Sequence, residues 1–344
     1  MPFDNALAVE RSGVEGPDAH LVHKASAQFA ATHPYLLFHR DALGRIRRRA
    51  GASPKLQARL ARSLSDPEPS FAAPDLRAAV KRRARRLIAT SFAALAGEGE
   101  YRERALAVSR AALTELAAAP SWKERPVIKS FLDCAEIAIA VAFAYDWLYD
   151  RLSPDERQAV EQAMLRQVLI PALAAYEDPS SRWPWRRDNC CLVSNSGILI
   201  AALAMLPCSR AIASALVQNS VSSSWNVFTA FAPDGAWPEG LSYWSLAVRY
   251  AGLMVAALES ALSDSFGLAE RPGFAQTGDF ALHAAGPFGA AFNFGDSVDR
   301  FDVSALAWLA HRFGRPIDSW LFGGYDGSHL PLATIWPKRP KAGP

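Results

Sequence analysis

Two long runs that are apolar on nearly every helical face constrain this chain most strongly. They cover residues 131–151 and 189–206. A helix that is apolar all round needs neighbouring helices on all sides. Further helical runs mix apolar and charged residues and are closed by Pro, Gly, Ser or Asp, near 41–50, 54–65, 75–97, 101–118, 154–176, 209–231, 238–263 and 303–313. The pattern predicts an all-α protein in which a shell of amphipathic helices encloses apolar ones.

The alternation of apolar and amphipathic helices favours an incomplete α/α toroid built of helix hairpins. An α-solenoid of stacked helix pairs is the alternative, although no fixed repeat period supports it. Strand signals occur only late, at 280–283 and 291–294, and predict at most a small β-hairpin near the C-terminus. We therefore expect an N-terminal tail (1–32), a toroid domain (33–320) and a C-terminal stub (321–344).

Composition narrows the classes of function. Half of the 344 residues are hydrophobic, so a sizeable core is expected, and the net charge of +3 does not indicate nucleic acid as a partner. The basic run at 77–86 is predicted to be a solvated helix face. The four cysteines lack metal-ligand spacing, so we expect no metal and no cofactor. No signal peptide or uninterrupted apolar run of about 18 residues is present, which predicts a cytoplasmic protein without a membrane span.

Arginines and tryptophans gather in one loop, at residues 181–189. Guanidinium groups match carboxylates in pairs of hydrogen bonds, and indole faces are flat and apolar. Sugar rings with acidic groups present both kinds of surface. We therefore expect the loop, with one further tryptophan, to bind an acidic sugar through Arg182, Trp183, Trp185, Arg186, Arg187 and Trp237.

Asn189 follows this loop directly and opens an apolar helix. The free backbone amides at a helix N-terminus favour an anion, so a ligand carboxylate is expected there. The alternative is that Asp188 or Asn189 simply caps the helix.

A second set of candidates begins at Pro238, which suits the first turn of the next inner helix. That placement would put Glu239, Tyr243 and Tyr250 on one face, since steps of four and seven residues nearly complete whole turns. Asp296 follows a glycine turn, where turn chemistry and a functional role are equally compatible with the sequence.

Taken together, these motifs resemble the helical domain of the heparinase II/III-like polysaccharide lyases. The resemblance covers roughly residues 33–336. It depends on the order and spacing of several segments, namely His33–Phe38, Phe131–Glu136, Tyr145–Tyr149, Asn189–Gly197, Pro233–Trp244 and Thr277–Asp296. It implies an α/α toroid followed by a β-sandwich domain, which would begin where this chain stops. It also implies export to the periplasm if the true start lies elsewhere.

The family's reaction is β-elimination at a uronic acid in a polysaccharide of the alginate or heparin type. By this resemblance, Asn189 would neutralise the substrate carboxylate and Tyr243 would shuttle the proton. A tyrosine with the ordinary pKa of about 10 would need a cationic neighbour to act as a base. The family places a histidine directly after the asparagine, whereas this chain has Cys190, which we include among the candidate catalytic residues.

Two other functions are compatible with the sequence. A toroid that binds glycans without cleaving them is favoured by Cys190 and by the absence of a β-sandwich from the sequence. A glycoside hydrolase would need two carboxylates about 6.5 to 9.5 Å apart, for which Glu239 with Asp296 or Asp234 are the candidates.

Overall fold

The computed structural model describes residues 16–30, 32–65, 76–122, 131–286, 290–292, 294–315 and 329–336. Most of the expected C-terminal stub and residues 1–15 of the expected tail lie outside these ranges. Within them, the only β-pairing is an isolated bridge between Ala285 and Ala291. The predicted all-α class is therefore confirmed.

The helices have the following bounds: α2 (Ala19–Ala27), α3 (Leu43–Gly51), α4 (Pro54–Ser65), α5 (Leu76–Ala96), α6 (Gly99–Ala118), α7 (Leu132–Leu148), α8 (Pro154–Met164), α9 (Ile170–Glu177), α10 (Asn189–Met205), α11 (Arg210–Phe228), α12 (Leu241–Leu262), α13 (Thr277–Ala284), α14 (Leu306–Phe313) and α16 (Leu330–Ala333). A π-helical turn, Leu165–Leu169, joins α8 to α9. Ser153 and Glu156 form a capping box ahead of α8, as the Ser-Pro-Asp-Glu sequence indicates.

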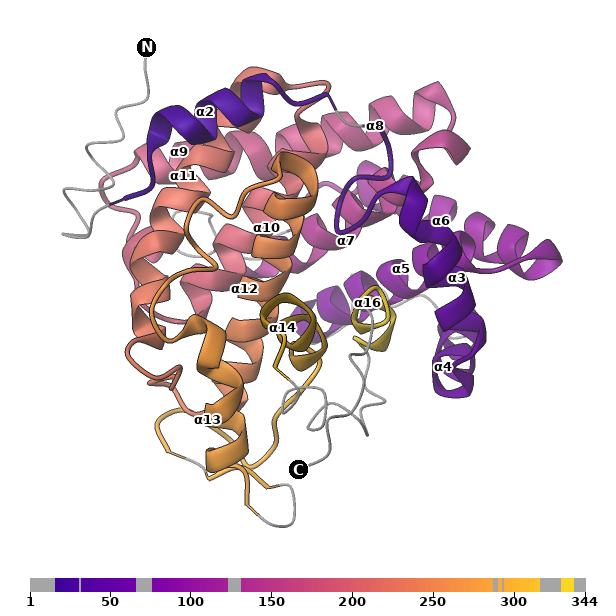
Figure 1. The fold of residues 1–344 in the computed structure, drawn as a ribbon. Helices are drawn as coiled ribbons and strands as arrows, with labels where there is room; N and C mark the ends of the chain where they lie inside the picture. The colour runs from indigo at the N-terminus through magenta and orange to yellow at the C-terminus, as the bar shows by residue number, and fades with distance from the viewer. Residues whose placement is uncertain are drawn as a thin grey trace.

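The helices form an inner and an outer row (Figure 1). In the inner row, α5 contacts α7, α7 contacts α10, and α10 contacts α12. In the outer row, α6 packs on α5 and α11 packs on α10, with α8 and α9 beside them. The two helices that are apolar all round, α7 and α10, are thus enclosed on all sides, as their sequences require. The toroidal closure of these rows remains a prediction.

Small residues let α7 and α10 approach closely. A Cβ added at Gly197 of α10 would lie 2.6 Å from both the Cα and the Cβ of Ala135 in α7. No other residue fits there without a shift of the backbone. The Gly197 position is therefore explained by helix packing.

A few buried polar groups fix α10 against its neighbours. The Asn195 amide donates to Ser223 of α11 (2.8 Å) and its oxygen accepts from Tyr176 of α9. The Ser196 hydroxyl lies 2.9 Å from the carbonyl of Tyr250 in α12. Buried polar groups need such partners, so these contacts specify how α10 sits against α9, α11 and α12.

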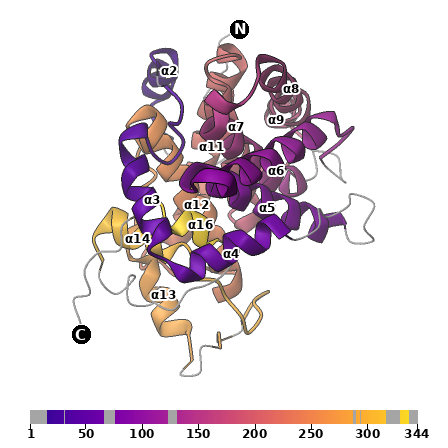
Figure 2. The same cartoon turned by 90° about the vertical axis from the view of Figure 1, so that its right-hand side faces the viewer.

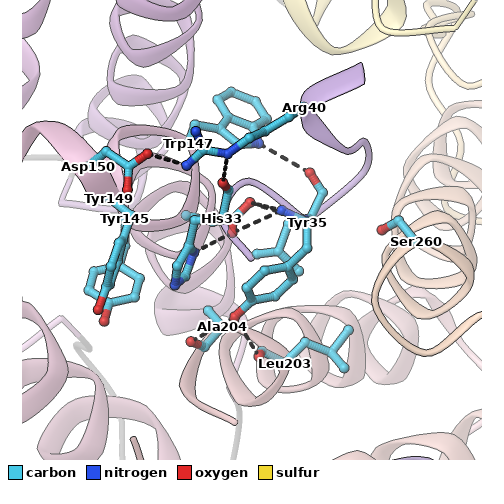
Figure 3. A network of polar contacts seen from close by, with 12 residues as sticks. His33, Tyr35, Arg40, Tyr145, Trp147, Tyr149, Asp150, Leu203, Ala204 and Ser260 are labelled. Carbon is cyan, nitrogen blue, oxygen red and sulfur yellow. Dashed lines mark hydrogen bonds and ion pairs between the residues drawn. The ribbon is translucent and has the colours of Figure 1, made fainter. Parts of the chain in front are cut away.

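The buried carboxylate of Asp146 in α7 holds the segment 33–38 (Figure 3). It accepts hydrogen bonds from the backbone amides of Tyr35 (3.0 Å) and Leu36 (2.9 Å), and it lies 2.7 Å from Nδ1 of His33. Burial raises the pKa of Asp146, and these hydrogen bonds act in the opposite direction. The next residue, Leu37, donates its amide to Ser260 of α12 (2.9 Å), so the segment links α7 to α12.

Two predictions about local structure were wrong. Residues 280–283 lie in helix α13 instead of a strand, and the expected hairpin is reduced to the Ala285–Ala291 bridge. Residues 19–27 of the expected tail form α2, which is capped by Asp18 and packs on α11. Arg210 of α11 reinforces this contact by donating to the carbonyls of Ala27 and Phe29.

Helix α12 is long and apolar enough to span a membrane by length and composition. In its most apolar window, however, 67% of the residues are buried inside the protein. Its apolar character is explained by its place in the inner row, where it contacts α10.

Replacing Asp146 with Asn should destabilise the protein by about 3 kcal/mol, because two amide donors and His33 lose a buried anionic acceptor. Asp150→Asn is the matched control, because the Arg40–Asp150 pair is exposed and should contribute less than about 1 kcal/mol. Urea unfolding of both variants measures the difference. Equal effects would contradict the anchoring role of Asp146.

Candidate functional site

The start of α10 is occupied by a carboxylate of the chain itself. Glu239 accepts from the backbone amide of Asn189 (2.8 Å) and from its side-chain amide (2.6 Å). The indole of Trp237 donates a third hydrogen bond to Glu239 (3.0 Å). Glu239 thus joins the first residue of α10 to the turn that precedes α12.

Asp188, and not Asn189, is the N-cap of α10. Its side chain accepts from the amide of Cys191 (3.1 Å) and forms an ion pair with Arg186. Two carboxylates therefore meet the free amides of the helix N-terminus, where anions are favoured. The anion that the sequence predicts at this position is supplied by Glu239 and Asp188.

The turn before α12 differs from the prediction. Helix α12 begins at Leu241, so Pro238 and Glu239 lie ahead of the helix and not in its first turn. Gly240 has a φ of 88°, and a Cβ there would lie 2.5 Å from the carbonyl oxygen of Phe294. This left-handed conformation and close approach require glycine. Because the chain turns at Gly240, Glu239 lies outside α12 and its side chain reaches the start of α10.

The loop that carries Asp296 packs on the same turn. The Ser297 hydroxyl accepts from the amide of Ser242 (2.9 Å), and the amide of Val298 donates to the Ser242 hydroxyl (3.1 Å). Asp296 itself is exposed. Asp234, the other candidate carboxylate, accepts from the amide of Ala236 (3.2 Å), as expected for a turn residue.

Tyr243 is the third residue of α12 and is half-buried, packed against the apolar core. Within the described ranges its hydroxyl has no hydrogen-bond partner. Cys190, next to Asn189 in the chain, is also half-exposed. Both side chains are therefore partly exposed, and Glu239 joins the start of α10 to the turn before α12.

The Arg/Trp loop divides into buried and exposed parts. Trp183 and Trp237 are 3% and 1% exposed, so their ring faces pack in the core and offer no sugar platform. Asn226 of α11 binds two residues of the loop. Its side-chain amide donates to the carbonyl of Trp185 (3.0 Å), and its side-chain oxygen accepts from the guanidinium of Arg187 (2.9 Å). Arg182 is exposed and, within the described part of the chain, forms no ion pair.

Tyr250 belongs to a different environment, two turns farther along α12. Burial and the nearby Glu136 carboxylate raise the pKa of Tyr250, and a hydrogen bond to Glu136 contributes. Glu136 also lies 3.6 Å from Lys81 of α5. The half-buried Glu136 therefore has its partners in α5 and α12.

Sequence reasoning missed a second cluster of ionisable groups beside Tyr250. Burial lowers the pKa of His329 well below its usual value, and the charges of Arg249, Arg85 and Arg59 lower it further. A small cavity of about 20 Å³, large enough for a water molecule, lies between His329, Arg249 and Trp308. The residues come from α4, α5, α12 and the chain before α16, and no local motif connects them.

This cluster also corrects the prediction for the basic run at 77–86. Arg83 is 4% exposed and pairs with Glu115 of α6 (2.6 Å), and the Nε atom of Arg85 is buried. The run is therefore only partly a solvated face.

No group of three or more metal-binding side chains occurs among the residues that the structure describes. No family model matches the chain, and no curated protein is similar to it. The site must therefore be interpreted from its geometry.

Acidification should destabilise the protein through His329. Because the folded pKa is lower than the unfolded value of about 6.5, the unfolded chain binds more protons, so the contribution of His329 to stability is lost as pH falls below about 6.5. His329→Gln should lose less stability than the wild type between about pH 7 and pH 5, whereas replacing the exposed His23 should leave the loss unchanged. Urea unfolding at both pH values tests this, and the same loss in wild type and His329→Gln would contradict it.

Proposed function

We propose that this chain binds an acidic polysaccharide at the joined ends of α10 and α12 and cleaves it by β-elimination. One observation carries the proposal. Glu239 brings the start of α10, with Asn189 and Cys190, against the turn that leads into Tyr243. The unpartnered, half-exposed hydroxyl of Tyr243 supports a reactive role, and the exposed Arg182 supports binding of a carboxylate.

Tyr243 would act on the ring carbon that carries the uronate carboxylate. Its phenolate takes the proton from that carbon, the carbon–carbon double bond forms, and the bond to the glycosidic oxygen breaks. The same hydroxyl then protonates the departing oxygen, so no water is consumed. A guanidinium such as that of the exposed Arg182 would balance the charge of the substrate carboxylate.

Asn189 would have a narrower role than the family resemblance implies. One amide proton is committed to Glu239, which fixes the orientation of the side chain. An asparagine amide carries a second proton. Asn189 is only 5% exposed, so this proton would act on a substrate carboxylate only at the edge of the buried helix start. The negative charge of Glu239 opposes a second carboxylate nearby, so neutralisation would require an arginine as well.

Two observations favour binding without cleavage as the second candidate. Cys190 stands where the resembled lyases have a histidine, and the anion position at α10 is filled by Glu239. A paired-carboxylate hydrolase is less well supported, because Glu239 already accepts from three donors and Asp234 accepts within its own turn.

Replacing Tyr243 with Phe should abolish elimination, a loss of at least about 100-fold, because the proton carrier is removed. The assay mixes the purified chain with alginate, heparin, heparan sulfate and hyaluronan and follows the ultraviolet absorbance of the new conjugated double bond. Binding to each polysaccharide is measured separately.

The control for this experiment is Tyr149→Phe. It also removes a tyrosine hydroxyl, but Tyr149 stacks on His33 and is not part of the candidate site. Absorbance that survives Tyr243→Phe would contradict the role of Tyr243. New reducing ends without absorbance would show hydrolysis, and binding without either product would establish the non-cleaving alternative.

A further inference from the structure

A groove of about 610 Å³ lies between α3, the end of α12, α14 and α16, and its volume is in the range of small-molecule sites. Helices α3, α12 and α14, which all contribute lining residues, can be followed in Figure 2. The lining residues that matter here are Arg45, Arg49, Glu259, Arg312, Trp308 and Trp336.

This groove is separate from the site at Tyr243. Glu259 and Ser260 line it from the last turn of α12, whereas Tyr243 lies in the first turn. At about 1.5 Å per residue, the 16 residues between Tyr243 and Glu259 span roughly 24 Å. A ligand in the groove would therefore not contact the proposed reactive tyrosine.

Glu259, one of the lining carboxylates, already has an ion-pair partner. Glu259 lies 2.7 Å from Arg312, which also lies 3.1 Å from Glu270. Asp41, the other lining carboxylate, is exposed and lies 3.8 Å from Arg45. Among the residues that the structure describes, Arg49 is therefore the lining arginine without a carboxylate partner.

Arg49 is held in an unusual position for a guanidinium. One of its terminal nitrogens donates to the carbonyl of Ile335 (2.6 Å), and within the described chain its buried Nε has no partner. Burial and the charge of Arg45 lower the pKa of Arg49. Arg45 and Arg49 are one helical turn apart on α3, a spacing at which like charges repel.

We propose that this groove binds a small ligand through an oxyanion (a carboxylate, sulfate or phosphate group) held between Arg45 and Arg49. An oxyanion would pair with the guanidinium of Arg49, which has no carboxylate partner among the described residues, and would offset the repulsion between the two guanidinium groups. Arginine forks bind such groups through paired hydrogen bonds. The half-buried Trp336 and the edge of Trp308 provide an apolar wall for the rest of the ligand.

The experiment is titration calorimetry of the purified chain with sodium sulfate, sodium phosphate and sodium glucuronate, each against sodium chloride of equal ionic strength. At least one oxyanion should give a binding signal that chloride does not give. Arg49→Gln and Arg45→Gln should each weaken the affinity for that oxyanion at least tenfold. Arg48→Gln is the matched control, because Arg48 is exposed on the same helix and does not line the groove.

The result also identifies the source of the oxyanion. Binding of glucuronate alone indicates a sugar acid, whereas binding of sulfate or phosphate indicates an inorganic anion or its ester. Arg45 is exposed, so its variant tests the site even if Arg49→Gln does not fold. No binding beyond chloride, or equal binding by the Arg45 and Arg48 variants, would overturn the proposal. Because Tyr243 is remote, this outcome leaves the elimination assay unaffected.

Discussion

The hydrogen bonds between Glu239 and Asn189 hold the candidate site together. They connect the first residue of α10 to the turn that precedes α12. The left-handed Gly240 makes the reach of Glu239 possible, and the indole of Trp237 supports its carboxylate. Without this link, the first turns of α10 and α12 would be joined only through packing.

The rest of the fold provides a rigid frame for this link. Apolar helices in the inner row bury almost all of their side chains, and a few polar contacts set their register. Asp146 secures segment 33–38 against α7, and that segment reaches the far end of α12 through Ser260. The ends of α12 thus face two different environments, the Tyr243 site and the groove of Arg49.

The sequence predicts most of the helices, because the apolar periods of the inner row are long and their stops are chemically clear. It does not predict α2, in which only Val22 and Ser26 are buried, or α13, whose short apolar run is equally typical of a strand. The candidate site residues were chosen by residue type, and the sequence did not predict their partners. Glu239 meets Asn189 across 50 residues, and the three arginines around His329 come from three separate helices.

The most direct test of this account is a double-mutant cycle on Asn189→Ala and Glu239→Ala, measured by urea unfolding. If Glu239 is the internal anion of α10, the two substitutions should be coupled by about 1 to 3 kcal/mol, because either one removes the shared hydrogen bond. Additive effects, within about 0.3 kcal/mol, would contradict the account. In that case the start of α10 would be free to hold the carboxylate of a ligand.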